Sequence, residues 1–230
     1  PHVRYVVQAL KALGKRPAIV MRGYGSKIDG VSDEQAEHRA ETEGVPVVAH
    51  PNRYEAVTRV LATTTPRSDV AVLDDGFQHR RLRRDLDLVL VDATRSPFTD
   101  RLLPAGWLRE PVSSLARASA VILTHADIPS EGALTQLRMD IERVTGARPI
   151  AETRHAWNNR IPALINERET VKEKDYLKGR KVLVVCAIGN PDAFLGQVRL
   201  SGANVAADIA FPDHAPFNDA QVKEIMTAAK

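Results

Sequence analysis

Two adjacent carboxylates, Asp74 and Asp75, carry the clearest chemical signal in this sequence. They directly follow the short apolar run Val70–Leu73, whose composition is typical of a buried strand in a parallel sheet. Ligands of open α/β sheets bind at the carboxyl ends of such strands. We therefore expect the two acids to stand where a nucleotide-binding sheet holds Mg²⁺, in the manner of a Walker B acid.

The segment that follows the acids is a polar turn rich in arginine. Gly76 allows the chain to turn away tightly, and Gln78 and His79 stay close to the same edge of the sheet. The run His-Arg-Arg-Leu-Arg-Arg at 79–84 is either a solvated turn or a surface that faces phosphates or acidic lipid headgroups. The functional interpretation is favoured because the run directly follows the acids. A nucleic-acid surface is not expected, because no aromatic residues are interleaved and the net charge is only +3.

Three further charged residues lie where a ligand could reach them. Arg22 follows the apolar run Ala18–Met21, so it also belongs to the carboxyl edge of the sheet, where it either binds anions or forms a simple salt bridge. Arg109 and Glu110 close a long loop rich in proline. Arginine suits bidentate contact with phosphate and glutamate suits a metal or its water, whereas the alternative is an ion pair that staples the loop.

The expected elements alternate in a way that indicates an α/β fold. Apolar strand-like runs at 18–21, 70–73, 86–91 and 120–123 are separated by helix-like stretches, among them 34–42 and 53–64. This alternation predicts a parallel sheet with crossover helices. A second, smaller α/β unit is expected from residue 181, with strands at 182–187 and 205–209, and the domain boundary is placed near residue 150. The predicted domains are thus an α/β core domain at 1–150 and a smaller C-terminal α/β domain at 151–230.

Several ordered motifs resemble one enzyme family. They are Arg-Gly-Tyr-Gly-Ser-Lys at 22–27, Asp-Asp-Gly-Phe-Gln-His at 74–79, Leu-Pro-Ala-Gly-Trp-Leu-Arg-Glu-Pro at 103–111, Ile-Gly-Asn-Pro-Asp-Ala-Phe at 188–194 and Phe-Pro-Asp-His at 211–214. Together they resemble the tetraacyldisaccharide 4'-kinases, the lipid A 4'-kinases, from Pro1 to about Phe217. The resemblance implies a P-loop-kinase-like fold, ATP and Mg²⁺ as cofactors, and phosphorylation of the 4'-hydroxyl of a tetraacylated glucosamine disaccharide 1-phosphate.

The resemblance also assigns roles to individual residues. It places Asp74, Asp75, Gln78 and Glu110 around the metal, and these four with His79, Arg109 and Arg22 around the nucleotide. It implies that Asp33 is the base for the sugar hydroxyl and that His214 pairs with Asp33. Read without the family, Asp33 and Glu34 are a helix N-cap and a favourable dipole charge. The chain has Val-Ser-Asp-Glu-Gln at 31–35, where the family commonly has Val-Gly-Asp-Glu-Pro.

The family context implies where the protein works and what the chain lacks. It implies peripheral contact with the inner membrane, on the cytoplasmic face. No Gly-x-x-x-x-Gly-Lys-Ser/Thr loop is present in the sequence, so we expect an internal fragment that does not phosphorylate by itself. Two alternatives need no such loop: a metal-dependent hydrolase using Asp74, Asp75, His79 and His214, and a non-catalytic module that binds lipid or a partner protein.

Overall fold

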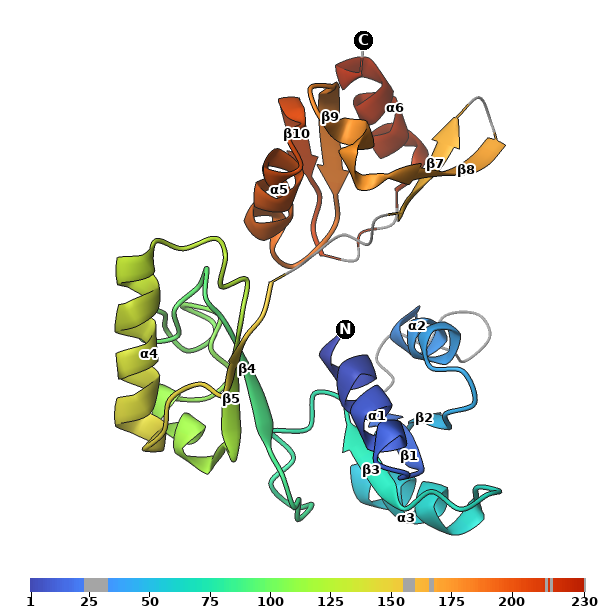
Figure 1. Ribbon diagram of the computed structural model, residues 1–230, viewed down its shortest axis with the longest axis vertical. Coiled ribbons are helices and arrows are strands. Elements are labelled where there is room, and N and C mark those ends of the chain that lie inside the picture. Colours follow the sequence, from blue (N-terminus) through green and yellow to red (C-terminus); the bar gives the residue numbers. More distant parts are fainter. Residues whose placement is uncertain (23–32, 155–159, 166–167, 214, 216, 230) are drawn as a thin grey trace. The chain divides into compact units, whose positions relative to one another are not determined.

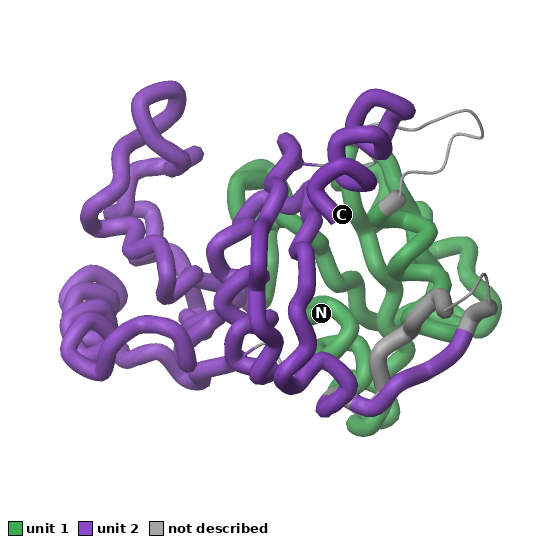
Figure 2. Tube along the Cα trace, turned by 90° about the horizontal axis from the view of Figure 1, so that it is seen from above, with its two compact units in different colours: residues 1–85 green, residues 86–230 purple. Residues whose placement is uncertain are grey.

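The computed structural model describes residues 1–22, 33–154, 160–165, 168–213, 215 and 217–229. The chain divides into two compact units, Pro1–Asp85 and Leu86–Lys230 (Figure 2). Each unit is built around parallel strands and the helices that cover them.

The first unit is a three-stranded parallel sheet with helices on its faces (Figure 1). The strand order is β2-β1-β3, so the first strand lies in the middle and the connection from β2 to β3 through α3 crosses over it. In chain order the elements are α1 His2–Ala12, β1 Pro17–Met21, α2 Asp33–Glu41, β2 Val47–Ala49, α3 Arg53–Thr63 and β3 Val70–Leu73.

The central strand β1 is buried on both faces. Ile19 and Met21 pack with Val7 of α1, and the alternate residues Ala18 and Val20 pack with Ala56 and Val60 of α3. Successive side chains of a strand point to opposite faces, so every residue of β1 needs to be apolar. This explains why the strand reads as an unbroken apolar run rather than as an alternation.

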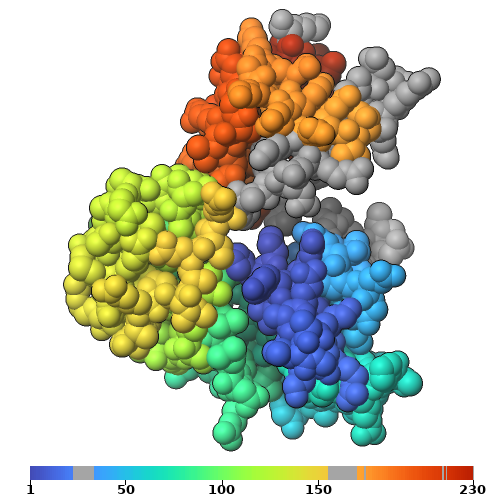
Figure 3. All heavy atoms as spheres, in the orientation of Figure 1, coloured from blue at the N-terminus to red at the C-terminus, as the bar shows by residue number. Residues whose placement is uncertain are grey.

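The second unit begins with another parallel sheet, in the order β4-β5-β6. Its strands are β4 Leu88–Asp92, β5 Ala120–Thr124 and β6 Ala151–Glu152, with the 3₁₀ helix η1 Val112–Arg117 and the helix α4 Glu131–Thr145 between them. Leu134, Leu137 and Ile141 follow one another at helical spacing and face the core that contains Val91 and Leu123. Ser130 caps the start of α4, and Gly146 ends it with a left-handed φ of 78°. The helix and the segments around it form one packed body in the space-filling view (Figure 3).

The rest of the second unit contains a hairpin and a smaller α/β layer. The elements are β7 Arg160–Ile165, β8 Arg168–Glu173, η2 Lys174–Leu177, β9 Lys181–Cys186, α5 Pro191–Leu200, β10 Asn204–Ala210 and α6 Asp219–Ala228. β7 and β8 pair antiparallel, whereas β9 and β10 pair parallel. Asn218 and Gln221 form a capping box at the start of α6.

The predicted α/β class and its parallel strands are confirmed, with two differences in detail. The short strand β2 and the β7–β8 hairpin were not expected. The division of the chain into compact units falls between residues 85 and 86 rather than near 150. The assignment of 1–150 and 151–230 as functional domains stays a prediction. No helix among the described residues is long and apolar enough to cross a bilayer.

Candidate functional site

Asp74 and Asp75 occupy the carboxyl end of β3, beside the central strand. The backbone N–H of Asp74 donates to the carbonyl of Val20 at 2.9 Å, which ties the start of the turn to β1. Asp75 has a φ of 50°, a left-handed conformation that non-glycine residues adopt infrequently. Unusual backbone conformations of this kind cluster at functional sites. The two acids therefore leave the sheet in a fixed and costly geometry.

Gly76 follows the acids because a side chain does not fit there. A Cβ atom at this position would lie 2.7 Å from the Cβ of Leu73, closer than real side chains approach. The N–H of His79 then donates to the carbonyl of Gly76 at 3.0 Å and closes the turn. The sequence reasoning placed the glycine correctly, and the structure gives the steric cause.

The basic turn divides into one structural arginine and three exposed ones. The guanidinium of Arg84 donates to the carbonyls of His79 at 2.6 Å and Leu82 at 2.9 Å, and so holds the turn closed. The side chains of Arg80, Arg81 and Arg83 are exposed. Only these three remain candidates for an anion-facing surface, because Arg84 serves the fold.

A buried arginine supports the turn formed by Asp74 and Asp75, here called the acidic turn. Arg53, the first residue of α3, is only 2% exposed, and its Nη2 donates to the backbone carbonyl of Asp74 at 3.1 Å. Its Nε and Nη1 have no hydrogen-bond partner among the described residues. Burial lowers the pKa of Arg53, and the charges of Asp75 and Asp74 oppose that shift. Buried guanidinium groups are rare unless paired, so this side chain marks the site.

A histidine holds the carboxylate of Asp74 from another helix. Nε2 of His38, on α2, lies 2.8 Å from Oδ2 of Asp74, and a carboxylate oxygen can only accept this bond. The hydroxyl of Thr42, just after the end of α2, donates to the carbonyl of His38 at 2.6 Å. The orientation of the Asp74 carboxylate is therefore fixed by a side chain carried on α2.

The surroundings of His79 lower the pKa of its imidazole, which favours the neutral form. Burial lowers its pKa first, and the positive charges of Arg53, Arg22 and Arg84 lower it further, whereas Asp75 raises it. A neutral imidazole offers one donor and one acceptor nitrogen, so it can contact either a phosphate or a bound water. Arg22, which directly follows β1, is one of these positive charges, and its contact with the nucleotide stays a prediction.

The acidic turn has the donors that Mg²⁺ prefers. Asp74, Asp75 and Gln78 offer oxygen atoms at one strand end, and Mg²⁺ is commonly held by one or two carboxylates with water and substrate phosphates completing the shell. No group of three or more His, Cys, Asp or Glu side chains with metal-binding geometry occurs among the described residues. The residues thus suit a metal that arrives with a nucleotide rather than a cage made only of protein.

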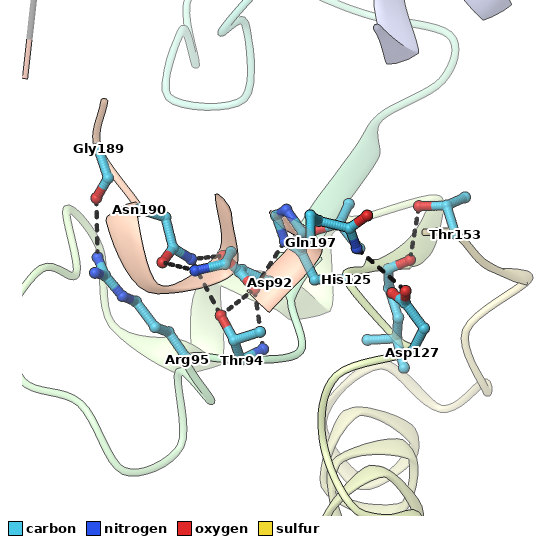
Figure 4. A network of polar contacts seen from close by, with 12 residues as sticks. Asp92, Thr94, Arg95, His125, Asp127, Thr153, Gly189, Asn190 and Gln197 are labelled. Carbon is cyan, nitrogen blue, oxygen red and sulfur yellow. Dashed lines mark hydrogen bonds and ion pairs between the residues drawn. The ribbon is translucent and has the colours of Figure 1, made fainter. Parts of the chain in front are cut away.

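The edge of the second sheet carries a separate polar network (Figure 4). Oδ1 of Asp92, at the end of β4, accepts from the Thr94 hydroxyl at 2.7 Å and from Nδ1 of His125 at 3.1 Å. Its Oδ2 accepts from Nδ2 of Asn190 at 2.7 Å, while Oδ1 of Asn190 accepts from the N–H of Ala193 and caps α5. One asparagine therefore joins the end of β4 to the start of α5.

Arg109 and Glu110 lie on the loop that follows β4. Oε2 of Glu110 is 2.6 Å from Nη2 of Arg117 in η1, so the glutamate pairs with η1. The side chain of Arg109 is exposed. These residues belong to the second unit, whereas Asp74 and Asp75 belong to the first. Their convergence on one metal and nucleotide site stays a prediction.

The expected pairing of Asp33 with His214 lies outside the described part of the chain. Asp33 is the first residue of α2, and its side chain lies outside the description. His214 and most of the motif at 22–27 also lie outside the described residues. Arg53, His38 and the network around Asp92 were not predicted from the sequence. In that network only Asn190 had a visible signal, because it precedes Pro191 in the motif at 188–194, as a helix cap does.

Comparison with known proteins decides the family. The family model described as LpxK, tetraacyldisaccharide-1-P 4'-kinase, matches residues 1–230. The chain belongs to this family. It is 37% identical to the tetraacyldisaccharide 4'-kinase of Anaeromyxobacter sp. (strain Fw109-5), over 96% of this chain and 62% of that protein. It is 34% identical to the kinase of the same name from Geobacter metallireducens, over 100% of this chain and 69% of that protein.

A solved structure of a family member has the same fold. A crystal structure of LpxK from Aquifex aeolicus, an "apo" form in complex with ATP, is similar with a TM-score of 0.61 and 28% identity, over 95% of this chain and 68% of that one. The family predicted from the motifs and the P-loop-kinase-like fold are thereby confirmed. The chain spans 62% of the length of the Anaeromyxobacter LpxK protein.

Proposed function

We propose that the protein carrying this chain transfers the γ-phosphate of ATP to the 4'-hydroxyl of a tetraacylated glucosamine disaccharide 1-phosphate. The carrying observation is the Asp74-Asp75 turn, fixed at the carboxyl end of β3 by Arg53 and His38, in a chain that the LpxK family model matches throughout. The names of the relatives and the ATP in the Aquifex aeolicus structure support the acceptor and the donor.

In this proposal each part of the site has one task. Asp74, Asp75, Gln78 and Glu110 would hold Mg²⁺, which neutralises charge on the phosphates when it is bound. Arg22, His79 and Arg109 contact the nucleotide phosphates, and fixed guanidinium groups suit this contact because they bind bidentately. Phosphoryl transfer needs mainly positioning and electrostatic stabilisation, which an acid turn held from two helices provides.

Asp33 and His214 complete the proposal on the acceptor side. Asp33 takes the proton of the 4'-hydroxyl, and the imidazole of His214 orients the carboxylate and stabilises the proton it receives. We place the reaction at the cytoplasmic face of the inner membrane, where an acylated acceptor with a polar headgroup would be presented to a peripheral enzyme.

The metal role is tested with matched aspartate variants of the protein expressed from its complete reading frame. Asp74→Asn and Asp75→Asn are each expected to shift the Mg²⁺ concentration needed for half-maximal phosphoryl transfer upward by at least about tenfold. Asp69→Asn is the control, because Asp69 lies directly before the start of β3, at the end away from Asp74, and pairs with Arg16. An equal shift for Asp69→Asn would remove the metal assignment.

The catalytic pair is tested by a double-mutant cycle. Asp33→Ala is expected to lower kcat by about 10²- to 10⁴-fold with nucleotide affinity nearly intact, since a base acts on the acceptor. Adding His214→Ala should cost little more than the worse single variant, because residues that act as one unit are not additive. Fully additive losses would refute the pair. Loss of ATP binding in Asp33→Ala would refute the role of Asp33.

A further inference from the structure

One loop of the second unit exposes an unusual concentration of apolar side chains. Leu102, Leu103 and Trp107 are 45%, 59% and 72% exposed, and Pro104 and Ala105 between them are exposed as well. Isolated exposed apolar residues need no explanation, but a contiguous group on one short loop marks an interaction surface. Here we call residues 101–108 the apolar loop.

The apolar loop is held in a fixed shape by its own backbone. The N–H of Leu103 donates to the carbonyl of Leu108 at 2.9 Å, and the N–H of Leu108 donates to the carbonyl of Arg101 at 3.0 Å. A Cβ atom on Gly106 would collide with the backbone oxygen of Arg101 and with the carboxylate of Asp100, so only glycine fits. The exposed side chains are therefore presented by a preformed turn, which costs less to bind than a flexible segment.

The charges around the apolar loop are positive on its outside. Arg95 and Arg101 are exposed, and the Arg95 guanidinium lies 5.4 Å from the centre of the Trp107 ring. The nearby carboxylate of Asp100 is turned inward, where it accepts from the N–H groups of Arg101 at 2.7 Å and Trp107 at 3.2 Å. An indole beside arginine, with apolar neighbours, is the combination that suits the boundary between headgroups and acyl chains.

We propose that the apolar loop docks on an anionic membrane surface, with Leu103 and Trp107 entering the acyl boundary and Arg95 and Arg101 contacting lipid phosphates. The inference rests on the proposed function in one respect: an acylated acceptor lies in a membrane, so the enzyme has to reach a membrane surface. It assigns the contact to a loop of this chain whose side chains the fold of the second unit leaves uncovered. Trp107 is a membrane-facing residue in this proposal.

The test uses the fluorescence of Trp107 itself. The sequence has two tryptophans, so Trp157→Phe leaves Trp107 as the reporter. The probe is a vesicle of phosphatidylethanolamine and phosphatidylglycerol with brominated acyl chains, which quench an indole only at short range. Trp107 emission is expected to shift to shorter wavelength and to be quenched, and vesicles of phosphatidylcholine alone should quench it much less.

Matched variants in the Trp157→Phe background test the two components of the surface. Leu103→Asp should weaken partitioning into anionic vesicles by about 10- to 100-fold, since it forfeits the burial of a leucine. Arg101→Glu should weaken it by about 30-fold, because each basic charge near such a surface contributes about a factor of five. Leu200→Asp is the control at an exposed leucine of α5 and should change partitioning by less than about twofold.

Three outcomes would overturn the proposal. They are unquenched Trp107 in every vesicle, equal losses for Leu103→Asp and Leu200→Asp, and quenching that appears only when the acylated disaccharide is added, which would make the loop an acyl-chain site for the acceptor. Phosphoryl transfer to acceptor in detergent micelles, measured in parallel with the protein expressed from its complete reading frame, separates the two ideas. Transfer without quenching refutes docking alone, and quenching without transfer refutes the kinase function alone.

Discussion

Asp92→Asn is the most informative single substitution for the second unit. The two carboxylate oxygens of Asp92 accept from the hydroxyl and N–H of Thr94, from His125 and from Asn190. An asparagine has one carbonyl oxygen and one amide NH₂, so in either orientation its NH₂ meets a donor. Asn190 cannot simply reverse its own amide, because its oxygen caps α5 through the N–H of Ala193.

The cost follows from the bonds that are lost or weakened. A hydrogen bond to a charged group contributes about 1.5–3 kcal/mol, and the remaining bonds become neutral ones of about half the strength. We therefore expect Asp92→Asn to lower the free energy of local opening at the start of α5 by about 2–3 kcal/mol. At about 1.4 kcal/mol per factor of ten, amide hydrogen exchange in the peptide that begins α5 should accelerate about 30- to 160-fold.

The matched control is Asp127→Asn, because Asp127 also contacts α5. Oδ2 of Asp127 accepts from Nε2 of Gln197, also on α5, at 3.2 Å, but this pair is exposed. Exposed pairs contribute little, so exchange should change by about twofold or less. Equal acceleration in Asp92→Asn and Asp127→Asn would refute the view that the part-buried network around Asp92, rather than any polar contact, fixes the start of α5.

Three further outcomes are expected. Burial raises the pKa of Asp92, but the hydrogen bonds from Thr94 and Asn190 outweigh burial and hold this pKa below 3.8. The stabilisation by the Asp92 carboxylate is therefore complete above pH 3.8. The difference in exchange between wild type and Asp92→Asn should shrink as the pH falls further and the carboxylate is protonated. Gly76→Ala should destabilise the first unit by about 1–3 kcal/mol in denaturant unfolding, whereas Gly132→Ala, with open space around its Cβ, should stabilise α4 by about 0.5–1 kcal/mol. Arg53→Lys should lower stability by about 1.5–3 kcal/mol and weaken Mg²⁺-nucleotide binding in titration calorimetry, while Arg59→Lys on the exposed face of α3 should leave both within about 0.5 kcal/mol. Unchanged stability in Gly76→Ala or Arg53→Lys would contradict the packing described for the acidic turn.

Local patterns were sufficient for the helices and for most strands. The helix predicted at 53–64 is α3 at 53–63, because apolar spacing and the Asn52 cap agree on where it begins. The strand β2 was missed because it has only three residues and gains its identity from pairing with β1. The β7–β8 hairpin was missed because β8 is polar and charged, like a connecting segment, and Pro162 interrupts the apolar residues of β7.

The acidic turn was predictable and its supports were not. Adjacent acids after an apolar run leave a signal in the sequence, because their position depends on neighbouring residues. Arg53 and His38 reach the turn from α3 and α2, so their roles depend on how the helices pack on the sheet. Neither spacing nor composition encodes this packing, and the same holds for the contact between Asn190 and Asp92 across 98 residues.

The left-handed backbone of Asp75 sets stability and chemistry against each other at one position. A glycine adopts this φ without strain, so Asp75→Gly would relieve the backbone while removing an acidic oxygen from the proposed metal site. Screens for thermal stability alone would then favour a substitution that a screen for phosphoryl transfer rejects. In directed evolution of this fold, selection for thermal stability alone would therefore enrich an inactive variant at position 75. A library scored for both stability and phosphoryl transfer would identify Asp75→Gly as stabilised but inactive.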